Sequence, residues 1–344
     1  LLNDKRDEAV DVLLKTLEVN SETADTYLVM GSLFRQRGEV DRAIRIHQDL
    51  LARPNLNREQ QGTVRLEWAR DYLKAGLLDR SERLLKELAD EGSQHAPICQ
   101  SLLLTIFEQE REWQQAAEVA EVLNNKGNET LHTQLAHYYC ELAEQAAKLD
   151  DAVEIRAYLR KALNADKNCV RASLIEGKLE EKLGNPKEAI KAYKRVKQQD
   201  PRYLPETLLP LERCHKALGE ERDYIKYLFG CIEEHPAVSL VIALSENVRQ
   251  IEGDKAGAYV LAEYLKKRPS VKGLHRLIDY HMQHSNGDAK ENLGILKAFT
   301  SKLIEHKPVY RCGHCGYEGK MLYWHCPSCH RWGSITPIHG LEGE

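Results

Sequence analysis

The sequence predicts an all-α fold, a solenoid of about eight to nine helix pairs that ends in a small metal-binding ribbon. Three observations support this prediction. Aromatic residues make up only 7% of the chain, with four Phe, so smaller side chains must fill the core, which favours helices over sheets. Small residues recur at a regular spacing along most of the chain. Four of the nine cysteines lie close together near the C-terminus.

One segment defines the repeated unit. Gly177 and Ala189 are small residues that let two helices approach closely, and Gly184 lies in the turn between these helices. Tyr193 fills the space beside the two small residues, and Pro201 ends the unit because proline cannot continue a helix. This pattern resembles the tetratricopeptide repeat, whose period is about 34 residues. We therefore expect a tetratricopeptide-repeat solenoid.

The same unit recurs along the chain. The last copies are degenerate: the unit from Val238 to Val271 lacks the turn glycine, and a final helix pair is expected at about 272–286 and 288–305. Terminal repeats depart from the pattern because an end unit faces solvent or another domain. Equivalent positions of the second helix follow at steps of roughly 33 to 39 residues: Ala9, Ala43, Ser81, Ala116, Ile155, Ala189, Tyr224 and Gly257.

The repeated small and aromatic residues are packing residues and carry no chemistry. Such solenoids usually hold a peptide or protein partner on a concave surface. First-helix residues face that groove in this geometry, which makes Arg35, Arg70, Arg171 and Lys178 candidate partner-binding residues. For each of them alone, a solvated surface position is the alternative.

Charge and hydropathy exclude several classes of function. The net charge of −4 and the pI near 6.4 argue against a general nucleic-acid binder, which usually carries a basic excess. The longest apolar run, Ala237–Leu244, is far shorter than the ~18–20 residues that cross a bilayer. Phosphate loops, nucleophile elbows and His-Glu-x-x-His pairs are absent from the sequence. We therefore expect a protein that is not an enzyme.

Two Cys-x-x-Cys pairs stand near the C-terminus, formed by Cys312, Cys315, Cys326 and Cys329. They can place four thiolates in a tetrahedron around one Zn²⁺ or Fe ion per chain. Two local disulfides are the alternative, but the odd number of nine cysteines and the scatter of the other five indicate a reducing compartment. The expected domains are residues 1–306 for the solenoid and 307–344 for the metal-binding module and tail.

The two cysteine pairs resemble those of rubredoxin, with Cys-x-x-Cys-Gly first and Cys-Pro-x-Cys second. The match departs at His330, where rubredoxins have glycine, and in a much shorter spacer. Four sulfurs already fill a tetrahedral site, so His314, His325 and His330 are interpreted as neighbours of the site or surface residues. Sulfur ligands alone do not separate Zn²⁺ from iron, and we favour Zn²⁺ for a structural role.

The same short segment is rich in aromatic residues. Tyr323, Trp324 and Trp332 exceed what so small a core can bury, so we expect them to dock the module on the last helices of the solenoid or on a partner. Arg311 and Lys320 make the module locally basic, which keeps an RNA-binding ribbon as an alternative.

Helical repeats followed by a rubredoxin-like module are an unusual combination, and the chain resembles the bacterial lipopolysaccharide assembly protein B family along its whole length. The stretches that carry the resemblance are Gly38–Gln48, His137–Ala143 and Leu322–Cys329, followed by Pro337-Ile338 and Gly340-Leu341. The resemblance implies that the four clustered cysteines are the metal ligands.

The resemblance also implies a function. Family members are adaptors that lower lipopolysaccharide synthesis by helping the membrane-bound AAA+ protease FtsH degrade the deacetylase that commits precursor to lipid A. An inner-membrane regulator antagonises them. A membrane helix holds their repeats at the cytoplasmic face of the inner membrane. Because the chain begins at Leu1, we expect a soluble fragment without that helix.

Two other functions stay open at this point. A rubredoxin-type iron would indicate an electron-transfer protein, and a basic ribbon would indicate an RNA-binding scaffold. A homodimer is also compatible with the sequence.

Overall fold

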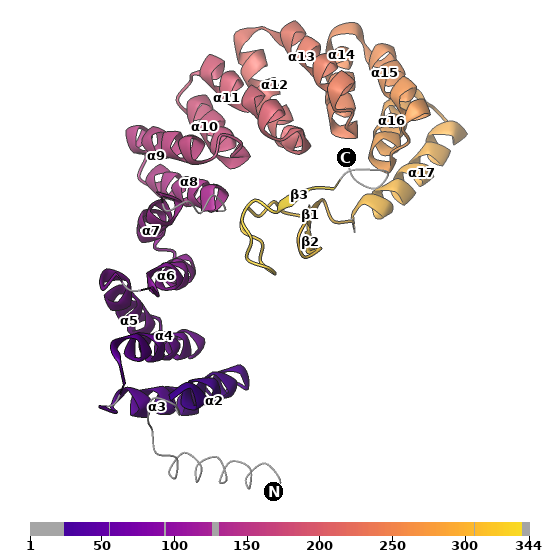
Figure 1. Cartoon of the computed structure of the whole chain (residues 1–344). Helices are drawn as coiled ribbons and strands as arrows, with labels where there is room; N and C mark the ends of the chain where they lie inside the picture. The colour runs from indigo at the N-terminus through magenta and orange to yellow at the C-terminus, as the bar shows by residue number, and fades with distance from the viewer. Residues whose placement is uncertain (1–23, 55, 93, 126–130, 306, 339–344) are drawn as a thin grey trace, which may run out of the picture. The chain divides into compact units, whose positions relative to one another are not determined.

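The computed structural model describes residues 24–54, 56–92, 94–125, 131–305 and 307–338 (Figure 1). These residues form sixteen α-helices, one 3-10 helix and three short strands, which confirms the predicted all-α repeat fold with a small C-terminal ribbon. Within the described part of the chain, no helix has both the length and the apolar composition needed to cross a lipid bilayer.

The chain divides into two compact units between Glu129 and Thr130. The strands of the ribbon belong to the second unit, together with the helices from α8 onward. The predicted domain boundary between residues 306 and 307 stays a prediction. The helices of the first unit are α2 (Ala24–Gln36), α3 (Val40–Leu51), α4 (Arg58–Lys74), α5 (Leu78–Asp90), α6 (Ala96–Glu110) and α7 (Trp113–Asn125).

The second unit carries the ribbon on the inner side of its curved helical array (Figure 1). Its helices are α8 (His132–Lys148), α9 (Ala152–Ala165), α10 (Val170–Lys182), α11 (Pro186–Gln199), η2 (Pro201–Thr207), α12 (Leu208–Leu218), α13 (Glu221–Glu234), α14 (Val238–Glu252), α15 (Asp254–Lys267), α16 (Val271–His284) and α17 (Asp288–Glu305). Its strands are β1 (Tyr310–Cys312), β2 (Glu318–Gly319) and β3 (Ile335–Pro337).

The turns within helix pairs need a residue with a left-handed backbone. Gly184 supplies it between α10 and α11 with φ +75°. Arg111 adopts φ 59° at the same place between α6 and α7, so the missing glycine does not remove the turn. The expectation that the Val238–Val271 unit lacks a turn glycine is wrong. Gly253 separates α14 from α15 with φ +95°, and it follows the turn residue Gly219 at about one repeat period.

Close helix approach inside a pair depends on glycine at certain positions, of which Gly177 is one. A Cβ atom added at Gly177 in α10 would lie 2.4 Å from Cε1 of the Tyr193 ring in α11. Tyr193 is itself buried in the core of the second unit. The two helices therefore touch through backbone on one side and an aromatic ring on the other, as the sequence predicts.

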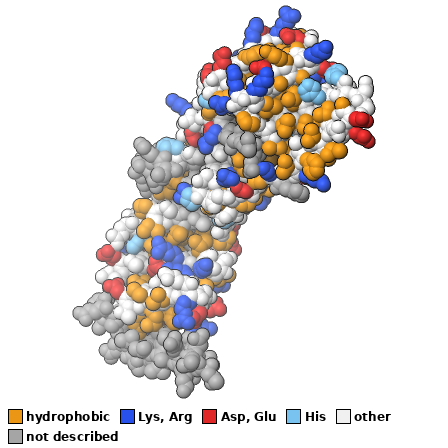
Figure 2. Space-filling view, turned by 90° about the vertical axis from the view of Figure 1, so that its right-hand side faces the viewer, with side chains coloured by type: hydrophobic (Ala, Val, Ile, Leu, Met, Phe, Trp, Pro, Cys, Tyr) orange, Lys and Arg blue, Asp and Glu red, His pale blue; other side chains and the backbone are white. Residues whose placement is uncertain are grey.

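The last helix leaves an apolar face open. Figure 2 shows hydrophobic side chains gathered on the face of the second unit that is turned toward the right of Figure 1, where α17 lies. Phe299 is 62% exposed, and Ile295, Leu296 and Leu303 of the same helix are also exposed. A terminal helix has no following repeat to cover it, which accounts for this face.

The close approach at Gly177 leads to a stability prediction. We expect Gly177→Ala to lower the free energy of unfolding by about 1–3 kcal/mol, because its methyl group would overlap the Tyr193 ring. Gly230→Ala in α13 is the matched control: nothing lies within 4 Å of its added Cβ, so stability should rise by about 0.5–1 kcal/mol. Urea unfolding followed by circular dichroism measures both, and equal effects would contradict the packing argument.

Candidate metal centre

A three-stranded antiparallel sheet of order β2-β1-β3 forms the base of the centre. Cys312 ends β1 and faces Ile335 of β3 in the strand register. Cys312, Cys326 and Ile335 form the small buried core of the ribbon. A core of this size cannot hold such a segment together alone, so the fold of the ribbon depends on what the cysteines bind.

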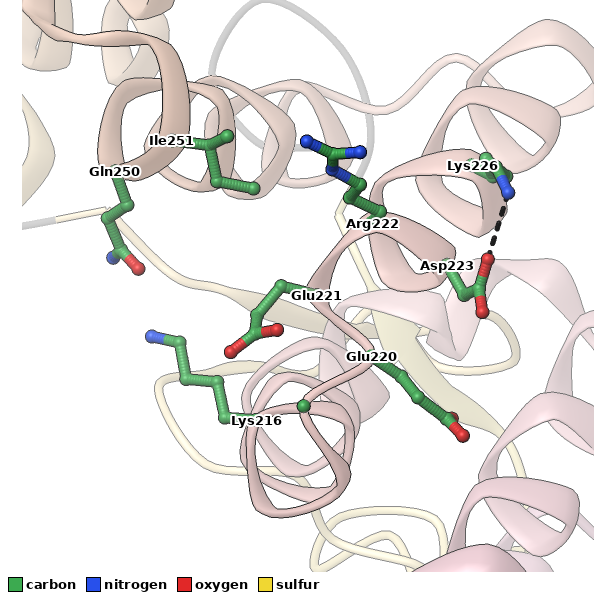
Figure 3. Close-up of a pocket in the computed structure, with 9 residues that line it drawn as sticks. Lys216, Glu220, Glu221, Arg222, Asp223, Lys226, Gln250 and Ile251 are labelled. Carbon is green, nitrogen blue, oxygen red and sulfur yellow. Dashed lines mark hydrogen bonds and ion pairs between the residues drawn. The ribbon is translucent and has the colours of Figure 1, made fainter.

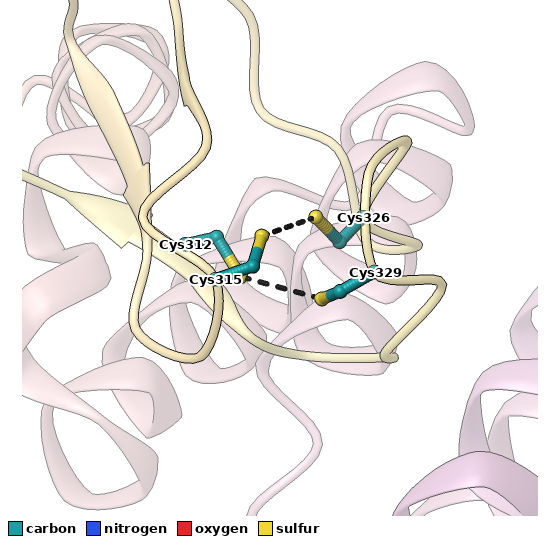
Figure 4. Close-up of side chains that lie close together, drawn as sticks. All are labelled: Cys312, Cys315, Cys326 and Cys329. Atoms are coloured by element: carbon teal, nitrogen blue, oxygen red, sulfur yellow. Dashed lines mark hydrogen bonds between the residues drawn. The ribbon is translucent and has the colours of Figure 1, made fainter.

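The four predicted cysteines converge on one point (Figure 4). All four Sγ atoms lie within 4.8 Å of one another. The Cys312–Cys329 and Cys315–Cys326 sulfur pairs are each 3.7 Å apart. Tetrahedral sulfur ligands about 2.3 Å from a metal lie about 3.8 Å from each other, so the sulfurs have the spacing of a metal site. They are far beyond a disulfide bond length of about 2.05 Å.

The two knuckles have the same backbone geometry. The N–H of Gly316 donates to the carbonyl of Cys312 at 3.1 Å, and the N–H of His330 donates to the carbonyl of Cys326 at 2.9 Å. Gly316 has φ 77°, and His330 has φ 54° in the equivalent place. His330 thus adopts the left-handed conformation that rubredoxin-like knuckles take with glycine, and the departure in sequence does not change the fold.

The environment favours a thiolate at Cys312. Burial disfavours the charged sulfur, but a hydrogen bond with Ser334 and backbone N–H groups of Cys315 and His314 outweigh it and lower the pKa of Cys312 to about 6. A thiolate is the form that binds a metal.

The neighbouring histidines make other contacts. His325 stacks on Trp332 with ring centroids 4.5 Å apart, and its Nε2 lies 2.9 Å from the carbonyl oxygen of His330. Among the described residues, the four cysteines are the group of side chains placed to share a metal ion, and none of His314, His325 and His330 belongs to it.

The ribbon packs against α8 through Trp332. This ring is 7% exposed and stacks on His137 of α8 with centroids 5.2 Å apart. It also meets Tyr138 edge-on at 5.9 Å. His137 is held neutral there, because burial first, and then the charges of Arg171 and His325, lower its pKa to about 3.

A second contact joins the ribbon to η2. Trp324 stacks on Tyr203 with centroids 5.4 Å apart, in a cluster that includes Val170. The Tyr203 hydroxyl donates to the carbonyl of Ile335 at 2.6 Å. The Tyr310 hydroxyl of β1 donates to Oε1 of Glu206 in η2, also at 2.6 Å. The sequence predicted docking on the last helices of the solenoid or on a partner, whereas these contacts lie on α8 and η2. Sequence reasoning did not single out His137 or Tyr203, since nothing in the sequence marks them as partners of the ribbon.

Tyr323 differs from the two tryptophans. It is 39% exposed, and its hydroxyl lies 3.9 Å from the sulfur of Met321 within the ribbon. Its neighbours Leu322 and Trp324 both pack in the cluster with Tyr203, whereas Tyr323 between them stays exposed.

The candidate groove residues lie in different surroundings. Arg35 binds Asp71 at 2.7 Å and Glu67 at 2.6 Å, and Asp71 also binds the buried His47 at 2.5 Å. Arg70 pairs with the same Glu67 at 2.6 Å. These arginines are therefore held in place by ion pairs within the first unit.

The other two candidates belong to the second unit. Arg171 is 4% exposed and pairs with Glu141 at 2.8 Å, so the expectation that it faces a groove is not met. A guanidinium can be buried there because carboxylates compensate its charge. Lys178 is exposed on α10, and its role in partner binding stays a prediction.

One charged cavity lies between α12, α13 and the end of α14 (Figure 3). Its lining mixes Lys216 and Arg222 with Glu220 and Glu221, and Asp223 pairs with Lys226 at 3.0 Å. The charges are balanced, and the cavity is open to solvent, so it does not form a focused binding site for an ion.

The metal centre leads to a prediction of binding stoichiometry. We expect the protein to bind one metal ion per chain and Cys326→Ser to lose it, since three sulfurs cannot complete the site. Cys214→Ser is the control, because Cys214 is a buried core cysteine of the helical array. Elemental analysis after gel filtration measures both. Full metal content in Cys326→Ser would contradict the four-sulfur site.

The docking contacts lead to a second prediction. Trp332→Ala should cost about 3–5 kcal/mol of the free energy that holds the ribbon on α8, because it empties a buried aromatic site. Tyr323→Ala should cost about 0.5 kcal/mol or less. Hydrogen exchange of residues 310–337 at constant metal content measures both. Equal exchange rates in the two variants would contradict the docking described above.

Comparison with known proteins agrees with this geometry. A family model described as a rubredoxin metal binding domain matches residues 310–337, and two tetratricopeptide repeat models match residues 26–60 and 141–203. The chain is 37% identical to Lipopolysaccharide assembly protein B of Escherichia coli strain K12 over 344 residues, which cover 100% of this chain and 88% of that protein. It is 36% identical to the protein of the same name from Haemophilus influenzae, over 99% of this chain and 88% of that protein. The chain therefore belongs to the lipopolysaccharide assembly protein B family.

Proposed function

We propose that the protein is a non-enzymatic adaptor in lipopolysaccharide assembly. It lowers lipid A synthesis by presenting the deacetylase that commits precursor to lipid A to the membrane-bound AAA+ protease FtsH. An inner-membrane regulator antagonises the adaptor. The printed name of its relatives supports the pathway. The tetratricopeptide repeats support a role in protein binding. The protease, the deacetylase and the regulator come from the family resemblance.

The observation that carries the proposal is the packing of the metal ribbon on the inner side of the second helical unit (Figure 1). A metal at the four cysteines stabilises the ribbon, and the ribbon covers His137 and Tyr203. The metal thereby controls which residues of the helical array are exposed. In this proposal it shapes a binding surface and takes no part in catalysis.

Zn²⁺ is the proposed metal, because four sulfurs leave no open position and the site has a structural role. A rubredoxin-like iron centre is the competing proposal, since sulfur ligands accept either metal. Elemental analysis combined with a redox titration decides between them. One Zn²⁺ per chain without a redox wave supports the adaptor, and a reversible iron couple supports electron transfer.

The ribbon is poorly suited to RNA. Arg311 pairs with Glu318 at 2.7 Å, and Lys320 donates to the carbonyl of Glu305 at 2.6 Å. Trp332 is buried against α8, so its face is not available for stacking on bases. These contacts support a protein partner over a nucleic acid.

The partner surface is proposed to include Lys178, which is exposed on α10. Arg35 and Arg70 would act by ordering α2 and α4 through Glu67.

Location at the cytoplasmic face of the inner membrane is part of the proposal, and fractionation of cells that express the full-length protein tests it. Gel filtration with light scattering tests whether the adaptor works as a homodimer.

The central test measures deacetylase turnover in a bacterium that lacks its own family member. With the full-length protein present, we expect the deacetylase half-life to fall after translation is stopped, and to stay long when FtsH is depleted. Trp332→Ala should lengthen the half-life because the ribbon no longer docks, whereas Tyr323→Ala should behave as wild type.

Two results would overturn the proposal. One is a deacetylase half-life that does not depend on the protein. The other is a Cys326→Ser variant that lacks metal and still shortens the half-life as well as wild type does, because the ribbon would then be dispensable.

A further inference from the structure

Two cysteines outside the metal centre face each other in the second unit. Cys140 lies in α8, and Cys169 stands directly before α10. Their sulfurs are 3.8 Å apart, and both side chains are buried, with Cys169 5% exposed. These two thiols are in contact across 29 residues of sequence, and neither the metal centre nor the proposed adaptor role uses them.

The surroundings make the two thiols unequal. The hydrogen bond from Cys140 lowers the pKa of Cys169, burial opposes this, and the backbone N–H of Ala172 in the first turn of α10 lowers it further. Burial raises the pKa of Cys140, which therefore keeps its proton. A thiolate therefore forms more readily at Cys169 than at Cys140.

Arg171 adds a cation beside the pair. Its charge favours the thiolate at Cys169 and at Cys140 alike. Its Nη2 binds Glu141 and Glu144, while its buried Nε and Nη1 have no hydrogen-bond partner among the described residues. The charge of Arg171 therefore stabilises a thiolate at this pair.

The geometry also allows the sulfurs to bond. A disulfide needs a separation of about 2.05 Å, so the sulfurs must close by roughly 1.8 Å. Cys169 has φ −68° and ψ 91°, which is an extended conformation outside α10. It follows a turn in which Lys167 and Asn168 are exposed. This end of the pair can shift without breaking a helix, and a small oxidant can approach it from the turn.

We propose that Cys140 and Cys169 are a reversible oxidation site that forms a disulfide with a peroxide as the oxidant. The Cys169 thiolate attacks one oxygen of hydrogen peroxide, an S–O bond forms, the O–O bond breaks, and hydroxide leaves and is protonated to water. The sulfur of Cys140 then attacks the sulfenic acid on Cys169. The S–S bond forms, the S–O bond breaks, and the hydroxyl leaves as water with the Cys140 proton. Two thiols and one peroxide give one disulfide and two waters.

The site lies under the docked ribbon. Cys140 follows His137 by one turn of α8, and His137 stacks on Trp332 of the ribbon. Cys169 precedes Val170, which packs in the cluster that holds Trp324. The disulfide therefore joins the two helical elements that form the floor of the ribbon contact.

The test treats the metal-loaded full chain with a few equivalents of hydrogen peroxide and maps its peptides by mass spectrometry without reduction. We expect a linked Cys140–Cys169 peptide that disappears with dithiothreitol. Cys99 is the control, since it is buried and burial raises its pKa. Cys169 should react faster than Cys99 by a factor on the order of ten or more.

A single variant isolates the first step. In Cys140→Ser, with folding verified by circular dichroism, the hydroxyl can still donate to Cys169 but cannot form a disulfide, so the sulfenic acid at Cys169 should accumulate and be trapped by dimedone. The proposal is overturned if folded Cys140→Ser shows no trapped Cys169. It is also overturned if wild type forms no Cys140–Cys169 peptide under conditions that oxidise the four metal-binding cysteines, a loss measured separately by metal release.

Discussion

The contact between the ribbon and the inner side of the second helical unit is the interaction on which the rest of that unit depends. The ribbon has a buried core of only Cys312, Cys326 and Ile335, so it needs both a metal and a surface to lie on. The helices need the ribbon in turn, because Tyr203 and His137 would otherwise place large rings in water. Each part therefore completes the hydrophobic core of the other.

Ion pairs with buried members join neighbouring helices in both units. The first unit uses charge: Arg35, Asp71 and the buried His47 join α2, α3 and α4 through short ion pairs and hydrogen bonds. Buried charges are costly alone, so this network holds only while every member is present. The second unit combines its own ion pair between Arg171 and Glu141 with apolar and aromatic packing against the ribbon. Loss of a metal would thus act on the second unit directly, and it would leave the charge network of the first unit intact.

Much of the fold and of the metal site could be predicted because both depend on local rules. Helix pairs follow from the period of small residues, and two Cys-x-x-Cys pairs suffice to predict four converging sulfurs. Local rules fail where another residue takes the role of glycine. Arg111 and His330 adopt left-handed conformations, which the identity of their side chains does not predict.

The sequence by itself determined the helical array, the metal ligands and the excess of aromatic rings beside them, because each is set by neighbours within about 40 residues. Only the tertiary structure decided which surface those rings meet. Tyr203 binds Ile335, and Tyr310 binds Glu206. In each pair the two residues are more than 100 positions apart in the sequence. It also decided that Arg171 lies inside, since its carboxylate partner stands 30 residues away on another helix. Contacts of this kind depend on how the helices stack, which no local pattern of residues expresses.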